Sequence, residues 1–118
     1  MRHAYYQGMN DTITLLNKVL DGAALRHQAL AANIANANTP GYRRKDVPFM
    51  QELKDAIQSP SEDALAKAAP KVREERNAAP IRLEAEFAAL SQNHLLYVSS
   101  ADLISRKYQR LTRAIRGN

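Results

Sequence analysis

Two long runs of apolar side chains, spaced alternately three and four residues apart, constrain the fold of this chain more than any other feature. The first run consists of Ile13, Leu16, Leu20, Ala23, His27, Leu30, Ile34 and Ala37. The second consists of Leu83, Phe87, Leu90, His94, Tyr97, Ala101, Ile104, Tyr108, Leu111 and Ile115. This spacing is that of a heptad seam, and it predicts two helices that would be roughly 38 Å and 50 Å long.

The residues that flank the two runs are typical of helix ends. We expect Asn10 or Asp11 to cap the first helix, because both side chains accept hydrogen bonds from free N–H groups of a first turn. Pro80 lies just before the second run, where a helix start tolerates proline. Gly117 follows the second run and predicts its end.

The segment 43–80 between the runs has a different character. Prolines recur in it at positions 48, 60, 70 and 80, so no long helix fits. A short amphipathic helix is plausible over 49–57, and the charged stretch 43–48 is extended at most briefly. Residues 58–79 are charged, rich in alanine and poor in large apolar side chains, and we expect them to be mobile in the isolated chain.

These features predict a mostly α fold in one structural unit. Residues 1–42 form the first helix and its exit, 43–80 an irregular connecting segment, and 81–118 the last helix. Because the connection must return, the two long helices would form an antiparallel hairpin resembling a coiled coil, with the two runs facing each other. In the simplest register Ile13 lies near Ile115 and Ile34 near His94.

Such a hairpin leaves a second set of apolar side chains on its outer faces. These are Leu15, Val19, Leu25, Leu95, Leu96, Val98 and Leu103. A second apolar stripe on two helices requires a further partner, and a single layer of this size seldom has enough interior to be stable alone. The chain is therefore expected to be one part of a larger assembly.

The end of the first run is unusual in composition. Five alanines lie between positions 29 and 37 and allow another backbone to come close, while Asn33, Asn36 and Asn38 carry amides that suit the unpaired carbonyl groups of a last helical turn. The sequence then breaks at Thr39-Pro40-Gly41-Tyr42. Proline and glycine fit the two central positions of a type II turn, so we expect a sharp and chemically defined exit.

The stretch from Leu30 to Tyr42 resembles the signature of bacterial flagellar axial proteins, a family of rod, hook and hook-junction subunits. The small size resembles that of rod subunits. The C-terminal part is similar to the B type of proximal rod subunit, with its sister C type as the alternative, in Glu84, Glu86, Asn93, Tyr97 and Gly117. The resemblance covers both ends of the chain, about two thirds of its length.

The resemblance implies a structural subunit of the flagellar basal-body rod that stacks helically with other rod subunits around the export channel. It implies export by the flagellar type III system without a cleaved signal, a periplasmic location, and helices that order on assembly. The implied partners are further copies of the chain, other rod subunits, a basal adapter protein and export-gate proteins. The seam residues named above would then form the assembly contacts.

The charge distribution supports one alternative. The net charge is +5, and its excess lies near the C-terminus, where arginines at 106, 110 and 113 share a helix face. A helical hairpin that binds nucleic acid or a membrane surface would use such a stripe. We favour salt bridges to neighbouring subunits, because Tyr108, Leu111 and Ile115 belong to the seam, and so expect no nucleic-acid binding.

No pattern in the sequence predicts an enzyme, a cofactor or a metal site. The chain has no cysteine, which excludes disulfides and thiolate ligands. His27 and His94 fall in different seams, would not meet in the expected register and are interpreted as polar register-setting residues. No run of about 18 apolar residues exists, so no membrane insertion is expected.

Overall fold

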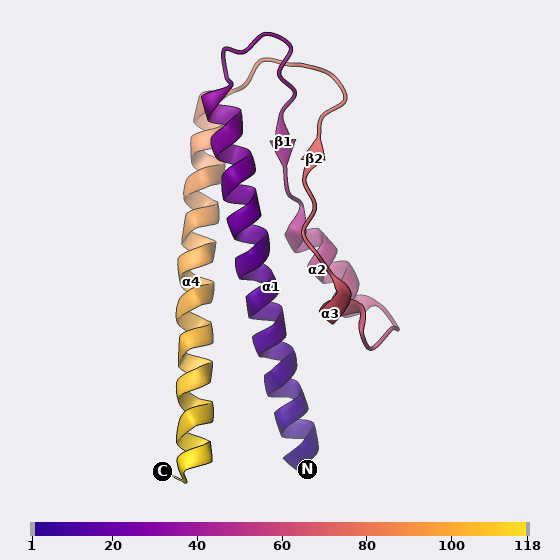
Figure 1. Ribbon diagram of the computed structural model, residues 1–118, viewed down its shortest axis with the longest axis vertical. Helices are drawn as coiled ribbons and strands as arrows, with labels where there is room; N and C mark the ends of the chain where they lie inside the picture. Colours follow the sequence, from indigo (N-terminus) through magenta and orange to yellow (C-terminus); the bar gives the residue numbers. More distant parts are fainter. Residues whose placement is uncertain (1, 118) are drawn as a thin grey trace.

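The computed structural model describes residues 2–117 and is dominated by two long antiparallel helices. The elements are α1 (Arg2–Ala35), β1 (Lys45–Asp46), α2 (Phe49–Gln58), α3 (Ala64–Lys67), β2 (Arg73–Glu74) and α4 (Leu83–Arg116). α1 and α4 lie side by side with both termini at one end, and the connecting elements pack on the other side of α1 (Figure 1). The molecule is flat, with extents of 60 × 31 × 14 Å. The predicted mostly α hairpin is confirmed.

The two ends of α1 differ from the prediction. The helix begins at Arg2, so Asn10 and Asp11 lie inside it and do not cap it. Nothing between residues 2 and 10 breaks a helix, since a single glycine costs only about 1 kcal/mol and the Thr12 hydroxyl donates to the Gly8 carbonyl within the helix at 2.9 Å. The helix ends at Ala35, two residues before the last seam position.

The end of α4 follows the sequence closely. α4 begins at Leu83 and ends at Arg116. Gly117 then adopts a left-handed conformation with φ of 74°, and its N–H donates to the carbonyl of Ala114. Only glycine takes this conformation without steric cost, so Gly117 ends the helix as predicted.

The face that α4 turns toward α1 coincides with the predicted seam only in part. The buried residues of α4 are Glu86, Asn93, Ser100 and Ile104. Of the seam residues on α4, Ile104 is buried and Leu90 and Leu111 are half-buried, whereas Leu83, Phe87, Tyr97, Tyr108 and Ile115 are between 41% and 77% exposed. On α1, Leu30 is buried and Ile13, Leu16, Leu20 and Ile34 are half-buried. Polar side chains therefore take three of the four buried positions of α4, and most of the large apolar side chains of its predicted seam lie beside the contact.

The register of the hairpin also differs from the predicted one. Asn93 Nδ2 on α4 donates to the carbonyl of Ala23 at 2.8 Å, and Asn33 Nδ2 donates to Glu86 Oε2 at 3.2 Å. Ile34 therefore lies beside the first turns of α4 and not beside His94, and the same shift separates Ile13 from Ile115. Polar pairs fix this alignment, which apolar spacing alone does not encode.

The observed register also changes the relative position of His27 and His94, which the predicted register separated. It places the two residues at a similar height on the hairpin, and both side chains are exposed. Within the described residues, no group of three or more histidine, cysteine, aspartate or glutamate side chains is arranged to hold a metal ion.

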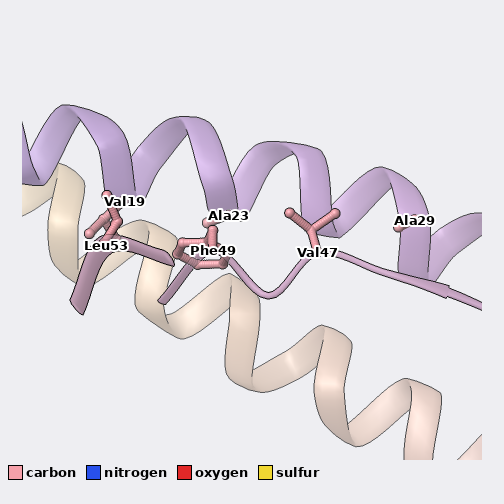
Figure 2. Packing of buried hydrophobic residues seen from close by; sticks show 6 residues of the cluster. All are labelled: Val19, Ala23, Ala29, Val47, Phe49 and Leu53. Carbon is pink, nitrogen blue, oxygen red and sulfur yellow. The ribbon is translucent and has the colours of Figure 1, made fainter. Parts of the chain in front are cut away.

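The connecting segment packs on α1 through α2, where the predicted helix 49–57 is confirmed as Phe49–Gln58. A small buried cluster forms where the two helices meet, and Figure 2 shows its α1 side chains directed toward those of the connecting segment. The cluster consists of Val19, Ala23, Ala29, Val47, Phe49 and Leu53. Phe49 lies directly against Gly22, where an added Cβ would come within 2.3 Å of the ring. Glycine at position 22 thus lets α2 approach α1.

The charged stretch before α2 forms a short strand, as the sequence allowed. β1 pairs with β2 in antiparallel fashion, with Lys45 opposite Glu74 and Asp46 opposite Arg73. Between α2 and β2 the chain forms only the one-turn helix α3, and residues 71–80 are all exposed. The expected mobility of 58–79 stays a prediction.

Candidate functional site

The exit from α1 is the type II turn expected from Thr39-Pro40-Gly41-Tyr42. The N–H of Tyr42 donates to the Thr39 carbonyl at 3.2 Å, and Gly41 has a φ of 77°. This φ lies in the region that glycine alone enters without strain. Thr39, Pro40 and Gly41 are exposed, and Tyr42 turns back toward α1.

Asn33 is the centre of the site, and its side chain is completely buried. Its Nδ2 donates to the carbonyl of Lys45 at 2.7 Å and to Glu86 Oε2 at 3.2 Å. Its Oδ1 accepts from the N–H of Lys45 at 2.9 Å and from the Tyr42 hydroxyl at 3.2 Å. The amide therefore uses all its ordinary donors and acceptors, and it binds β1 as a neighbouring strand would.

None of the three amides is seen to serve an unpaired carbonyl as predicted, because the Ala32 carbonyl that Asn36 contacts already accepts the backbone N–H of Asn36. Asn36 Nδ2 donates to the Ala32 carbonyl at 2.9 Å, one of the carbonyls at the end of α1, and its Oδ1 accepts from the Thr39 hydroxyl at 3.1 Å. Asn33 was expected to serve such a carbonyl and instead joins three segments of the chain. Asn38 is exposed.

A chain of charged groups extends from Asn33 across the molecule. Glu86 is buried, with 2% exposure, and forms an ion pair with the Nε of Arg44. Arg44 Nη2 reaches Asp46 Oδ2 at 3.2 Å, and Arg26 Nε on α1 donates to Asp46 Oδ1 at 2.8 Å. The buried carboxylate of α4 is thus paired and hydrogen-bonded, as a buried charge requires. The charges join α1, β1 and α4.

The surroundings of Asp46 and Arg44 favour the charged forms of both side chains. Partial burial by itself would raise the pKa of Asp46, but hydrogen bonds from Arg26 and the Val47 N–H, with the charges of Arg26 and Arg44, hold that pKa below its ordinary value. The hydrogen bond to Glu86 is the largest cause of a raised pKa at Arg44, and it outweighs the opposing effect of burial.

Tyr42 stays a neutral phenol beside these groups. Burial raises the pKa of its hydroxyl, and the negative charges of Glu74 and Glu86 raise it further. A neutral hydroxyl can donate its proton, which the hydrogen bond to Asn33 Oδ1 requires. We refer to Asn33, Tyr42, Arg44, Asp46 and Glu86 as the polar clamp, because together they fasten the strand β1 and the start of α4 to the end of α1.

The second part of the site is the set of apolar side chains that α4 leaves uncovered. We call Leu83, Phe87, Tyr97, Val98, Tyr108 and Ile115 the outer stripe; all six are more than 40% exposed. At about 100° per residue, most of them lie to one side of the line through Glu86, Asn93 and Ile104 that contacts α1. The structure thus gathers the turn residues and Asn33 into one clamp, and leaves most seam residues of α4 on a free surface.

Sequence patterns did not predict Arg44, Asp46, Glu86 and Asn93 as anchors. One signal was present: Glu86, Asn93 and Ser100 are each seven residues apart, which places polar side chains in one line at heptad spacing. Arg44 and Asp46 lie in a short charged stretch that becomes partly buried only because the connecting segment folds back against α1 and α4. Nothing local distinguishes them from solvated charges.

Comparisons with known proteins find similarity that centres on the end of α1 and its exit. The model of a family described as flagella basal body rod protein matches residues 23–43, the segment that holds Asn33 and the type II turn. In this segment the chain is similar to flagellar basal body rod proteins.

Among the relatives are flagellar basal body rod proteins FlgB of several bacteria. The Escherichia coli protein is 51% identical over 41 residues, which is 35% of this chain and 30% of that protein. The Aeromonas hydrophila protein is 29% identical over 109 residues, or 78% of this chain and 83% of that protein. The Borrelia hermsii protein is 41% identical over 46 residues, covering 39% and 34% of the two chains. The match to the E. coli protein thus spans less than a third of its length.

In the part of the chain that the structure describes, none of the helices combines the length and the apolar character needed to cross a bilayer.

Proposed function

We propose that this protein is a structural subunit of the bacterial flagellar basal-body rod, of the proximal B type, and not an enzyme. The observation that carries the proposal is the outer stripe on a hairpin that is similar to this family. A row of exposed aromatic and aliphatic side chains along one helix is typical of a protein that is completed by its neighbours. The names of its relatives supply the neighbours to consider, which are other rod subunits.

Assembly supplies what the isolated hairpin lacks. The buried apolar cluster contains six residues, two of them alanines, and three of the four buried residues of α4 are polar. Burial of an exposed Phe87 or Ile115 contributes about 1.5–3 kcal/mol per side chain. We infer that the polar clamp fixes the shape of the subunit, while contacts of the outer stripe with neighbouring subunits stabilise its helices.

The finer features follow from the same proposal. Head-to-tail contacts between subunits generate an open helical tube, here around the export channel in the periplasm. The chain would reach this place through the flagellar type III export system without a cleaved signal. A proximal position brings it next to the basal adapter and export-gate proteins as well as other rod subunits.

The first test removes the gene from the bacterium that carries it. We expect loss of swimming and basal bodies without a complete rod, both restored by the wild-type gene, with the protein detected in purified basal bodies by mass spectrometry. Normal swimming after deletion, or absence of the protein from basal bodies, would contradict the proposal.

A second test addresses the outer stripe. Phe87→Glu changes an exposed residue, so we expect the purified chain to keep its circular dichroism while rods fail to assemble. Gln92→Glu is the matched control, since Gln92 is exposed on the same helix outside the stripe. Normal rods with Phe87→Glu would refute a role of the stripe. The alternative of nucleic-acid binding predicts affinity that falls steeply with salt concentration, and we expect no saturable binding.

A further inference from the structure

A groove runs between the N-terminal half of α1 and α2, on a different part of the molecule from the outer stripe. It has a volume of about 460 Å³ and a largely apolar floor. Its floor is formed by Leu15, Leu16, Val19, Met50, Leu53 and Ile57. A second hollow of about 400 Å³ shares Leu15 and Ile57 with it and extends the groove toward Glu62. Ile57 is 57% exposed and Met50 51%, so apolar surface is available in the groove.

The groove lies in an acidic part of the chain. Residues 49–63, which form α2 and the turn after it, contain four acidic side chains and one basic one, for a net charge of −3. Glu62 lines the groove and its side chain is exposed. Lys54 is the basic residue of this segment. An apolar floor that leads to the exposed carboxylate of Glu62 in the adjoining hollow fits a basic amphipathic helix.

The same chain contains such a helix without a complete partner. Residues 103–117, at the end of α4, carry five basic side chains and no acidic one. Within this segment Tyr108 is 48% and Ile115 77% exposed, because α1 and α4 lie farther apart at the end that holds both termini (Figure 1). Arg110, Arg113 and Arg116 are exposed, and within the described side chains none of them forms an ion pair.

We propose that the last turns of α4 of one copy dock into the α1–α2 groove of a second copy. The apolar side chains Tyr108 and Ile115 would contact the groove floor. Arg116 follows Tyr108 and Thr112 at intervals of four residues, so it lies on the same side of α4 as Tyr108 and would approach Glu62. α2 has 10 residues and is therefore about 15 Å long, which matches about three turns of α4. This inference rests on the proposed function, since it names the surfaces through which rod subunits meet.

The contact joins two different surfaces and is therefore heterologous. Each copy has one groove and one α4 end. When two copies meet, one groove and one α4 end stay free, so further copies can add and the series of subunits is open. The area is limited to one short helix in one groove. Single contacts are thus weak, and the purified chain associates measurably only at high concentration or when a bond traps the contact.

Cysteine trapping tests the proposal directly, because the chain has no cysteine of its own. Two full-length variants are prepared, Ile57→Cys in the groove and Ile115→Cys at the end of α4, both at exposed positions. They are mixed under mild oxidation. We expect disulfide dimers that contain one copy of each variant to form several-fold faster than dimers of either variant with itself. Equal rates for all three pairings would overturn the proposal.

Charge variants then distinguish docking from random collision. Arg116→Glu in the Ile115→Cys chain is expected to slow the mixed disulfide by about two- to five-fold, and Glu62→Arg in the partner is expected to restore it. Arg110→Glu is the matched control, since Arg110 lies on the opposite side of the helix from Tyr108 and Ile115 and its reversal changes the net charge equally. Equal slowing by both reversals, without rescue, would show general charge attraction and would overturn the docking geometry.

Assembly in cells separates this inference from the proposed function. If Ile115→Glu rods assemble normally while Phe87→Glu rods fail, the protein is a rod subunit and the groove contact is refuted. If the mixed disulfide forms as expected but the protein is absent from basal bodies, the self-contact stands and the proposed function fails.

Discussion

Gly22 allows a sharp test of how α2 is held on α1. A Cβ at position 22 would lie 2.3 Å, 2.4 Å and 2.7 Å from Cγ, Cδ2 and Cβ of Phe49, whereas ordinary contacts begin at 3.4 Å. The ring would have to move by about an ångström, which costs typically 1–3 kcal/mol in a packed cluster. Alanine favours the helix by about 1 kcal/mol relative to glycine. We therefore expect Gly22→Ala to lower the free energy of unfolding by about 1 kcal/mol.

Two further variants isolate the cause. Gly8 also lies in α1 but has nothing within 4 Å of an added Cβ, so Gly8→Ala should raise the free energy of unfolding by up to about 1 kcal/mol. In a Phe49→Ala background the obstacle is gone, and Gly22→Ala should then stabilise by a similar amount. The double-mutant cycle should give a coupling energy of about 2 kcal/mol between positions 22 and 49.

The assay is urea unfolding followed by far-ultraviolet circular dichroism, with hydrogen exchange of the α2 amides as a second measurement if the transition is broad. Exchange in α2 should speed up in Gly22→Ala and stay unchanged in Gly8→Ala. Stabilisation of the wild-type background by Gly22→Ala, or a coupling energy near zero, would refute the close approach of Phe49 to α1.

Three further predictions concern the clamp and the turn. Asn33→Ala leaves the Lys45 N–H and carbonyl without their partner and should cost about 2–4 kcal/mol of unfolding free energy in urea melts; a loss below 0.5 kcal/mol would contradict the central role of this amide. The pKa of Asp46 is lowered in the folded state, so its stabilising effect is complete above the ordinary aspartate pKa of about 3.9 and is lost as pH falls through the folded value; Asp46→Asn should flatten the decline of the urea midpoint with acid, and an unchanged slope would argue against the ion pairs. Gly41→Val places a branched side chain at a φ of 77°, which costs about 1–3 kcal/mol or more, and should impair motility in swimming plates; wild-type swimming would refute the need for glycine there.

Local chemistry predicted the ends of the elements well. The turn at Pro40-Gly41, the stop at Gly117 and the short helix that begins at Phe49 all depend on residues a few positions apart, and all three are present. The start of α1 was not predicted, because Asn10 and Asp11 are residue types that often cap a helix and here lie inside one.

The pairing of the long helices could not be predicted in the same way. Apolar spacing identifies a stripe but does not say whether the stripe contacts the same chain or another one, so Phe87 and Tyr97 were assigned to the interior of the hairpin and are exposed. The register depends on Asn33 with Glu86 and on Asn93 with the Ala23 carbonyl. These are long-range polar contacts whose geometry exists only once the connecting segment has folded back.

We propose that the outer stripe is free in the single subunit and covered in the rod. Val98→Cys, at a position 49% exposed, introduces the only thiol of the chain and allows this to be measured. Maleimide labelling is compared in the purified protein, in intact basal bodies and in basal bodies after dissociation. The account predicts fast labelling of the first and third samples and strong protection in the second. Equally fast labelling of intact basal bodies would contradict it.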